Sequence, residues 1–191
     1  MGAGPKRIDG FISVDALDWG DGLTDIVWDL TKVPYEFAEA DSVDEIVAIE
    51  FLEHISWRDT NKVLTEWYRI MKSGAKLGIQ VPAIDKMMEM YVNKEICSCV
   101  EHKPLDYGYD EVKKERLGKG KKDCWNCGGR ARVNPDRWIQ AFLGAQKHEW
   151  DYHRNIFTKE RLEESLKAVG FRDIKVEYDK YEWKLKSICY K

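Results

Sequence analysis

The sequence has no apolar run near the roughly 18 residues that a membrane span needs, and no secretion signal at its start. Its net charge is only −3, so the total charge gives no reason to expect nucleic acid as a partner. Four of the five cysteines fall between Cys97 and Cys127. Without a secretion signal, such clustering favours metal binding or free thiols over disulfides. We therefore expect a cytoplasmic protein with no membrane partner.

What is present is the composition of a globular protein. Hydrophobic residues make up 43% and charged residues 34% of the chain, and 191 residues can bury a sizeable core. We expect a single domain over residues 1–191. An insertion or cap is predicted at about 84–157, where the regular pattern gives way to charges, cysteines and aromatic residues.

Strand and helix patterns alternate outside that insertion. Apolar runs predict strands at 11–15, 25–30, 45–49, 75–81, 171–178 and 181–190. One apolar face predicts a helix near 60–71, with Asp59 as its cap and Gly74 among its stop signals. A second helix is predicted between the cap Thr158 and the terminator Gly170.

This alternation predicts an α/β fold, a doubly wound, mostly parallel Rossmann-like sheet with helices on both faces. The last two strands, joined by a tight turn, form a closing antiparallel hairpin. The strand at 45–49 is apolar enough to be buried on both faces.

Polar residues cluster where the strand at 45–49 gives way to the next helix, in the run Glu50-Phe51-Leu52-Glu53-His54. The carboxyl ends of strands in an open α/β sheet face the ligand crevice. The segment from Val43 to Pro82 is therefore predicted to carry one edge of an active site.

Four ordered motifs resemble those of the class I S-adenosylmethionine-dependent methyltransferases, in particular small members with an EHxLEH-like fourth strand end. They are GAGPKRIDGFISVDA at 2–16, DIVWDLTKVPYEF at 25–37, the 43–82 segment and HRNIFTKERLEESLKAVGFRDIKV at 153–176. The resemblance covers about two thirds of the chain and rests on the order of the motifs, since a lone GxG is weak evidence.

The resemblance implies a cofactor site for S-adenosylmethionine. Gly2, Ala3 and Gly4 would form the loop that approaches the methionine part of the cofactor, because glycine lets a backbone come that close. Asp15 would hold the ribose hydroxyls. Asp29 and Leu30 would border the adenine, and Glu50 and Phe51 would line the sulfonium end.

The same resemblance places Glu53, His54 and His153 on the acceptor side, as candidate catalytic bases. Each of these positions also has a structural interpretation. Asp15 and Asp29 suit ordinary turns after strands, Glu53 and His54 suit a solvated helix start, and a lone histidine such as His153 is often structural.

The chain departs from the family pattern at its beginning. The family's first strand lies in the middle of the sheet and should precede Gly2, where only Met1 stands. We expect either a fragment of a longer product, or another segment or a partner chain, such as a homodimer's second copy, in that gap. Ten residues separate Gly4 from Asp15, so the family's first helix must be shortened to a loop. Ala83 and Ile84 follow Pro82, where relatives often carry an aspartate.

The insertion carries two cysteine pairs that predict a zinc site. Cys97 and Cys99 form one pair, and Cys124 and Cys127, followed by two glycines, resemble a zinc knuckle. Four thiolates in a tetrahedral array would close a structural zinc site, with His102 as a replacement for one of the first pair. Reduced, partly buried thiols are the alternative, and Cys189 is expected in the core.

The insertion is also basic. From Val112 to Arg137 there are nine Lys or Arg residues against three acids, a local net charge of +6. With Trp125 or Trp138 for base stacking, the region 112–138 could contact nucleic acid, although such runs are usually solvated surface.

The function expected first is methyl transfer from S-adenosylmethionine to an O, N or C acceptor, with a small molecule or glycan as the first candidate. Two alternatives stay open. One is a methyltransferase-like subunit that binds no cofactor alone and serves a partner chain. The other is a nucleic-acid-binding module that works through the basic, cysteine-rich insertion. Fold alone does not choose between them.

Overall fold

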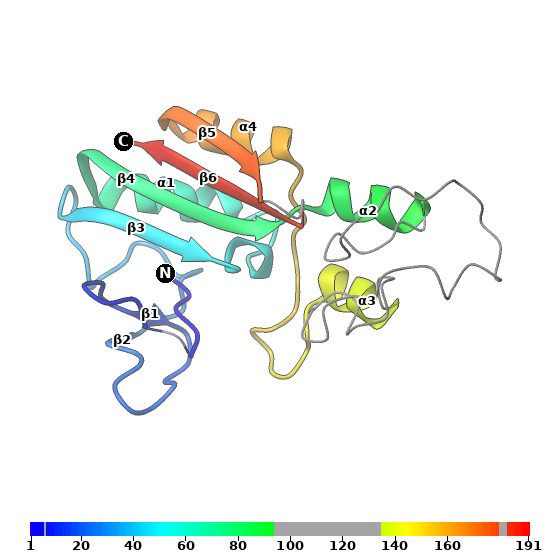
Figure 1. Ribbon diagram of the computed structural model, residues 1–191. Helices are drawn as coiled ribbons and strands as arrows, with labels where there is room; N and C mark the ends of the chain where they lie inside the picture. The colour runs from blue at the N-terminus through cyan, green and yellow to red at the C-terminus, as the bar shows by residue number, and fades with distance from the viewer. Residues whose placement is uncertain (6, 94–134, 180–182) are drawn as a thin grey trace, which may run out of the picture.

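The computed structural model describes residues 1–5, 7–93, 135–179 and 183–191. Figure 1 shows the elements along the chain. They are β1 (Val14–Asp15), β2 (Ile26–Val27), β3 (Val43–Ile49), the 3-10 helix η1 (Leu52–His54), α1 (Thr60–Ile70), β4 (Met71–Pro82), α2 (Ile84–Asn93), α3 (Pro135–Leu143), α4 (Lys159–Val169), β5 (Arg172–Tyr178) and β6 (Lys184–Tyr190).

The strands form a four-stranded sheet in the order β3-β4-β6-β5 and a separate parallel pair, β1-β2. β3 and β4 are parallel, while β6 is antiparallel to both of its neighbours, β4 and β5. The closing hairpin thus places one antiparallel strand in the sheet, which confirms that part of the prediction. The fold is mixed α/β with mostly parallel strands.

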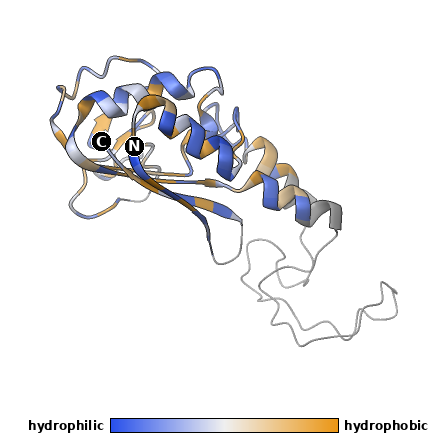
Figure 2. Cartoon of the chain, turned by 90° about the horizontal axis from the view of Figure 1, so that it is seen from above, coloured by the Kyte–Doolittle hydropathy of each residue, from blue (hydrophilic) through white to orange (hydrophobic). Residues whose placement is uncertain are grey.

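One face of the larger sheet carries the core. α1 and α4 pack against each other on that face, as Figures 1 and 2 show. Trp67 of α1, Leu166 of α4 and Leu77 of β4 are fully buried there. Burying large side chains of this kind contributes about 1.5–3 kcal/mol each.

The opposite face of the same sheet is open across the described part of the chain. Ile49 and Ile188 are each 45% exposed, and Glu45 pairs with Lys76 across β3 and β4. The prediction that β3 is buried on both faces is therefore wrong. Helices on both faces are likewise not found among the described residues, because the long segments before β1 and β3 run as loops. Between Gly4 and Asp15, where the family has its first helix, the described residues form a loop, as the short spacing predicts.

The sheet is divided at the place where the sequence predicts a gap. β1 and β3 belong to different sheets, and the first residues of the chain lie between them. The Met1 nitrogen donates to the Val47 carbonyl of β3 at 2.8 Å, and the Ala3 N–H donates to the Val14 carbonyl of β1 at 3.2 Å. Residues 1–3 therefore connect the two sheets.

Local signals predicted α4 well and α1 less well. Thr158 accepts a hydrogen bond from the Arg161 N–H at 3.2 Å, and Gly170 ends α4 with a φ of 110°. At α1 the Asp59 side chain makes no capping bond, and the Ser56 carbonyl accepts from the Asp59 and Thr60 N–H groups instead. Met71 begins β4 and does not continue the helix.

The predicted insertion at 84–157 is partly helical. α2 and α3 lie at its two ends, and Ile84, Met87, Ala141 and Trp183 form a small core between them. Cys97, Cys99, Cys124 and Cys127, and most of the basic region 112–138, lie outside the described residues. Cys189 is fully buried in the main core, as expected. No helix among the described residues has the length and apolar character to cross a membrane.

Candidate functional site

The glycine segment and Asp15 lie together. Gly2 and Gly4 have φ values of 60° and 59°, a region that favours glycine. The Gly4 N–H donates to Oδ2 of Asp15 at 2.9 Å. A Cβ at Gly2 would overlap the Phe51 ring. The structure therefore brings Gly2, Gly4, Asp15 and Phe51 into one constellation, although they come from three separate parts of the chain.

The Asp15 carboxylate is held in place by backbone groups on both oxygens. Oδ2 accepts from Gly4, and Oδ1 accepts from the Leu17 N–H at 3.0 Å. An ionised carboxylate has about four acceptor positions, so each oxygen keeps a lone pair for a further donor. This oriented carboxylate can accept hydrogen bonds from a pair of neighbouring hydroxyls.

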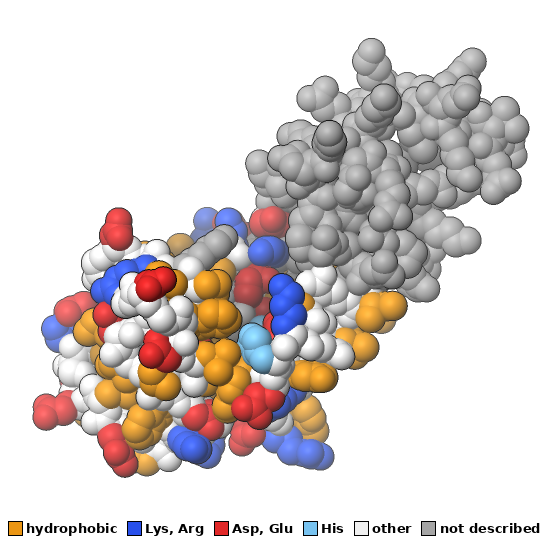
Figure 3. All heavy atoms as spheres, turned by 90° about the horizontal axis from the view of Figure 1, so that it is seen from below, with side chains coloured by type: hydrophobic (Ala, Val, Ile, Leu, Met, Phe, Trp, Pro, Cys, Tyr) orange, Lys and Arg blue, Asp and Glu red, His pale blue; other side chains and the backbone are white. Residues whose placement is uncertain are grey.

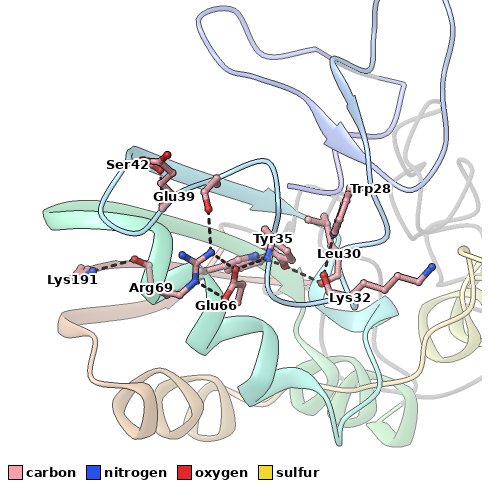
Figure 4. Close-up of polar contacts among 11 residues, drawn as sticks. Trp28, Leu30, Lys32, Tyr35, Glu39, Ser42, Glu66, Arg69 and Lys191 are labelled. Atoms are coloured by element: carbon pink, nitrogen blue, oxygen red, sulfur yellow. Dashed lines mark hydrogen bonds and ion pairs between the residues drawn. The ribbon is translucent and has the colours of Figure 1, made fainter.

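The segment after β2 is hydrogen-bonded to α1 through Tyr35 (Figure 4). Asp29 accepts from the backbone and hydroxyl of Thr31, and Leu30 is a core residue at 3% exposure. The Tyr35 hydroxyl donates to the Leu30 carbonyl at 2.9 Å and accepts from Nε1 of Trp67 at 3.1 Å. The position of Asp29 thus depends on Tyr35.

Tyr35 is in turn held by a carboxylate that the sequence analysis missed. Oε1 of Glu66 accepts from the buried Tyr35 N–H at 2.7 Å, and the Arg69 guanidinium donates to both Glu66 oxygens at 2.6 and 2.9 Å. Arg69 also donates to the Ala38 carbonyl at 3.1 Å. The signal was present, because Glu66 lies on the apolar face of α1 beside Val63 and Trp67.

Glu50 sits at the carboxyl end of β3 in the left-handed region, with a φ of 51°. Such a backbone is uncommon for a residue other than glycine and clusters at functional sites. Its Oε1 accepts from Nε2 of Gln80 at 3.2 Å and lies 3.4 Å from Nζ of Lys184. Glu50 is therefore a partnered carboxylate at the sheet edge.

Glu53, His54 and His153 form a second constellation. The Glu53 carbonyl accepts from the Arg154 and Asn155 N–H groups at 2.8 and 3.1 Å, which brings His153 beside η1. The two imidazole rings meet edge to face with their centroids 4.9 Å apart. His153 therefore has a partner at the site, despite being distant in sequence. In the view from below in Figure 3, a histidine lies at the surface beside acidic and basic side chains.

Burial governs the charge state of this second constellation. Burial, followed by the Glu50 charge, raises the pKa of Glu53 well above its ordinary value. Burial lowers the pKa of His54 and of His153, and the nearby His153 lowers that of His54 further. Both imidazoles are thus predominantly neutral at neutral pH, a state in which a ring nitrogen can accept a proton or bind a metal.

No family model matches the sequence, and no curated protein matches it. Solved structures do match. A SAM-dependent methyltransferase from Archaeoglobus fulgidus aligns with a TM-score of 0.52 and 14% identity over 94% of this chain and 75% of that one. A Burkholderia thailandensis 1,6-didemethyltoxoflavin N1-methyltransferase, solved with S-adenosylhomocysteine, aligns with a TM-score of 0.51 and 13% identity. The alignment covers 100% of this chain and 68% of that one. The chain has the class I methyltransferase fold.

The chain spans less than half the length of one matched structure. The chain spans 43% of a possible exported protein from Bordetella parapertussis, at a TM-score of 0.49 and 12% identity. Within the methyltransferase fold, the glycine segment spans the division between the sheets, with Gly4 bonded to Asp15 of β1 and Gly2 against Phe51, which follows β3. The cofactor roles assigned to them, and to Ala3, Asp29, Leu30 and Glu50, stay predictions.

Proposed function

We propose that this protein transfers a methyl group from S-adenosylmethionine to an O, N or C acceptor. The observation that carries the proposal is the constellation of Gly2, Gly4, Asp15 and Phe51 within a methyltransferase fold. The close approach of Gly2 to Phe51 leaves room for a backbone only, and the Asp15 carboxylate is oriented with lone pairs to spare. These residues fit the methionine and ribose parts of the cofactor.

When bound, the cofactor supplies an activated methyl group on its sulfonium. The chain's own part is to hold the acceptor in line and exclude water, a contribution that proximity and orientation can make large. Asp15 would accept hydrogen bonds from the ribose, and Glu50 and Phe51 would border the reacting end. If the acceptor must lose a proton, Glu53, His54 and His153 are the bases we propose.

The acceptor we propose is a small molecule or a glycan. His153 lines a small cavity together with the apolar Ile84, Ile156 and Phe157 and the polar Glu53 and Asn155. That cavity has room for about one water molecule, so the acceptor would bind beside it and not within it.

Tritium-labelled S-adenosylmethionine tests the proposal directly. The chain is incubated with separate pools of small metabolites, glycans and RNA, and label in the acceptor is counted. We expect transfer into the small-molecule or glycan pool, and none from a boiled control.

His54→Ala should lower transfer without weakening the binding of S-adenosylhomocysteine, because His54 belongs to the second constellation and not to that of Gly2, Gly4 and Asp15. The matched variant is His148→Ala, whose ring packs on Trp19 outside the cluster. Transfer unchanged in His54→Ala would remove His54 from the acceptor side.

A further inference from the structure

The cluster of Glu53, His54 and His153 has a chemistry of its own, which goes beyond methyl transfer and does not depend on it. One ligand atom from each of these residues lies within 4.8 Å of those from the other two. We propose that Glu53, His54 and His153 bind a divalent transition-metal ion, with zinc as the ion that this donor set fits best.

Glu53 supplies the observation that indicates a bound cation. The residue is 2% exposed, and neither carboxylate oxygen has a hydrogen-bond partner among the described residues. Lys184 acts on it electrostatically, but Nζ of Lys184 is paired with Glu50. A buried carboxylate without a partner is costly, so such a group in a folded protein needs an explanation. A metal ion would satisfy both oxygens.

The two histidines are oriented as metal ligands usually are. Nδ1 of His153 lies 2.8 Å from the Ala141 carbonyl, and Nδ1 of His54 lies 3.3 Å from the Tyr152 carbonyl. These contacts assign the proton of each neutral ring to Nδ1 and leave the lone pair on Nε2. Histidine ligands almost always donate their other N–H to a carbonyl or carboxylate in this way.

The backbone fixes the separation of the three ligands. The Glu53 carbonyl accepts from Arg154 and Asn155, and the His153 N–H donates to the Leu143 carbonyl at 3.1 Å. The Asn155 side chain donates to Oγ1 of Thr60 at 2.8 Å. Ligand atoms about 2.0–2.2 Å from zinc lie roughly 3.3 Å apart, so binding requires the side chains to close by about 1–1.5 Å.

Two imidazoles and one carboxylate favour a transition metal over Mg²⁺ or Ca²⁺, which prefer oxygen ligands. Three protein ligands also leave a fourth position open, as in catalytic zinc sites. An organic ammonium is the other cation that could pair with Glu53. The cavity lined by Glu53, His153 and Asn155 has room for only about one water molecule, which suits a bare ion.

The test uses the full chain after metal is removed with EDTA. Because Cys97, Cys99, Cys124 and Cys127 can also bind zinc, the parent carries serine at all four positions. ZnCl₂ is titrated by calorimetry, and CoCl₂ is followed by visible absorption. We expect one equivalent to bind, and His153→Ala to weaken binding by about 100-fold. His148→Ala, which removes a histidine outside the cluster, should bind like the parent.

Wild-type protein with Co²⁺ provides the second measurement, should the serine parent fail to fold. Thiolate ligands give intense charge-transfer bands, whereas histidine and carboxylate ligands give only weak visible bands. His153→Ala should remove only the weak bands and leave the charge-transfer bands of the thiolates unchanged. The proposal is overturned if neither protein binds a stoichiometric ion outside the thiolates, or if His153→Ala binds as the parent does. Binding of methylammonium in place of zinc would overturn it in favour of an ammonium site.

Discussion

Glu66 is the residue on which the loop before β3 depends, and its removal is the sharpest stability test. Glu66→Ala leaves the buried Tyr35 N–H without an acceptor, at a cost of about 1–3 kcal/mol. It also removes the pair with Arg69, whose side chain is 36% exposed, worth about 0–1 kcal/mol. We therefore expect the free energy of unfolding to fall by about 1–4 kcal/mol in urea denaturation.

The matched control is Glu163→Ala. Glu163 also pairs with a basic residue within one helix, Lys167 at 3.7 Å, but at the surface. This change should cost no more than about 0.5 kcal/mol. If Glu66→Ala and Glu163→Ala destabilise the protein equally, the buried Tyr35–Glu66 bond does not have the importance assigned to it.

Glu66→Gln separates the charge from the hydrogen bond. Its amide oxygen still accepts from Tyr35, so about 1 kcal/mol of the loss should remain, chiefly from Arg69. The Arg69 hydrogen bond, with that from Tyr35, lowers the pKa of Glu66 from its model-compound value of 4.5. The charge therefore stabilises the fold above about pH 4.5, and its contribution is lost as the pH falls through the folded pKa. The stability difference between wild type and Glu66→Gln should shrink below that pH; a constant difference would contradict this assignment.

Three further results are expected. Burial raises the pKa of Cys189 to about 12, so at pH 8 iodoacetamide should modify its peptide only after unfolding in urea, and modification in the native state would place the thiol outside the core. Gly170→Ala should cost about 1–2 kcal/mol in urea denaturation, because a φ of 110° strains alanine while its nearest neighbour, Tyr68, lies 3.7 Å away. A cost near zero would show that α4 can end differently. Glu53→Gln should stabilise the chain in EDTA at neutral pH by about 1–3 kcal/mol, since burial raises the pKa of Glu53 and the amide is uncharged without taking up a proton, and destabilisation in EDTA would contradict this assignment.

The parts of the fold that the sequence predicts are those with local causes. Thr158 and Gly170 bound α4 because capping bonds and a left-handed terminator act within a few residues. The succession of strands along the chain and the closing hairpin follow in the same way from apolar runs and turns. The Asp59 cap was wrong because the Ser56 carbonyl provides another acceptor for the first N–H groups of α1.

The parts that could not be predicted depend on distant contacts. Glu53 and His153 are brought together by backbone hydrogen bonds between η1 and the segment before α4, and no pattern within either segment reports them. The exposure of the second face of the sheet could not be predicted either. An apolar strand such as β3 is predicted to be buried whether or not a helix covers its second face. The connection that residues 1–3 make between β1 and β3 could not be predicted either, because it exists only where the two strands belong to separate sheets.

The central claim is a cofactor site built on Gly2, Gly4 and Asp15, and titration with S-adenosylhomocysteine by calorimetry tests it most directly. The account predicts micromolar binding that is lost in Asp15→Ala. It also predicts that Asp18→Ala, which removes an exposed turn carboxylate nearby, binds unchanged. No binding to the wild-type chain, or equal binding to wild type and Asp15→Ala, would contradict it.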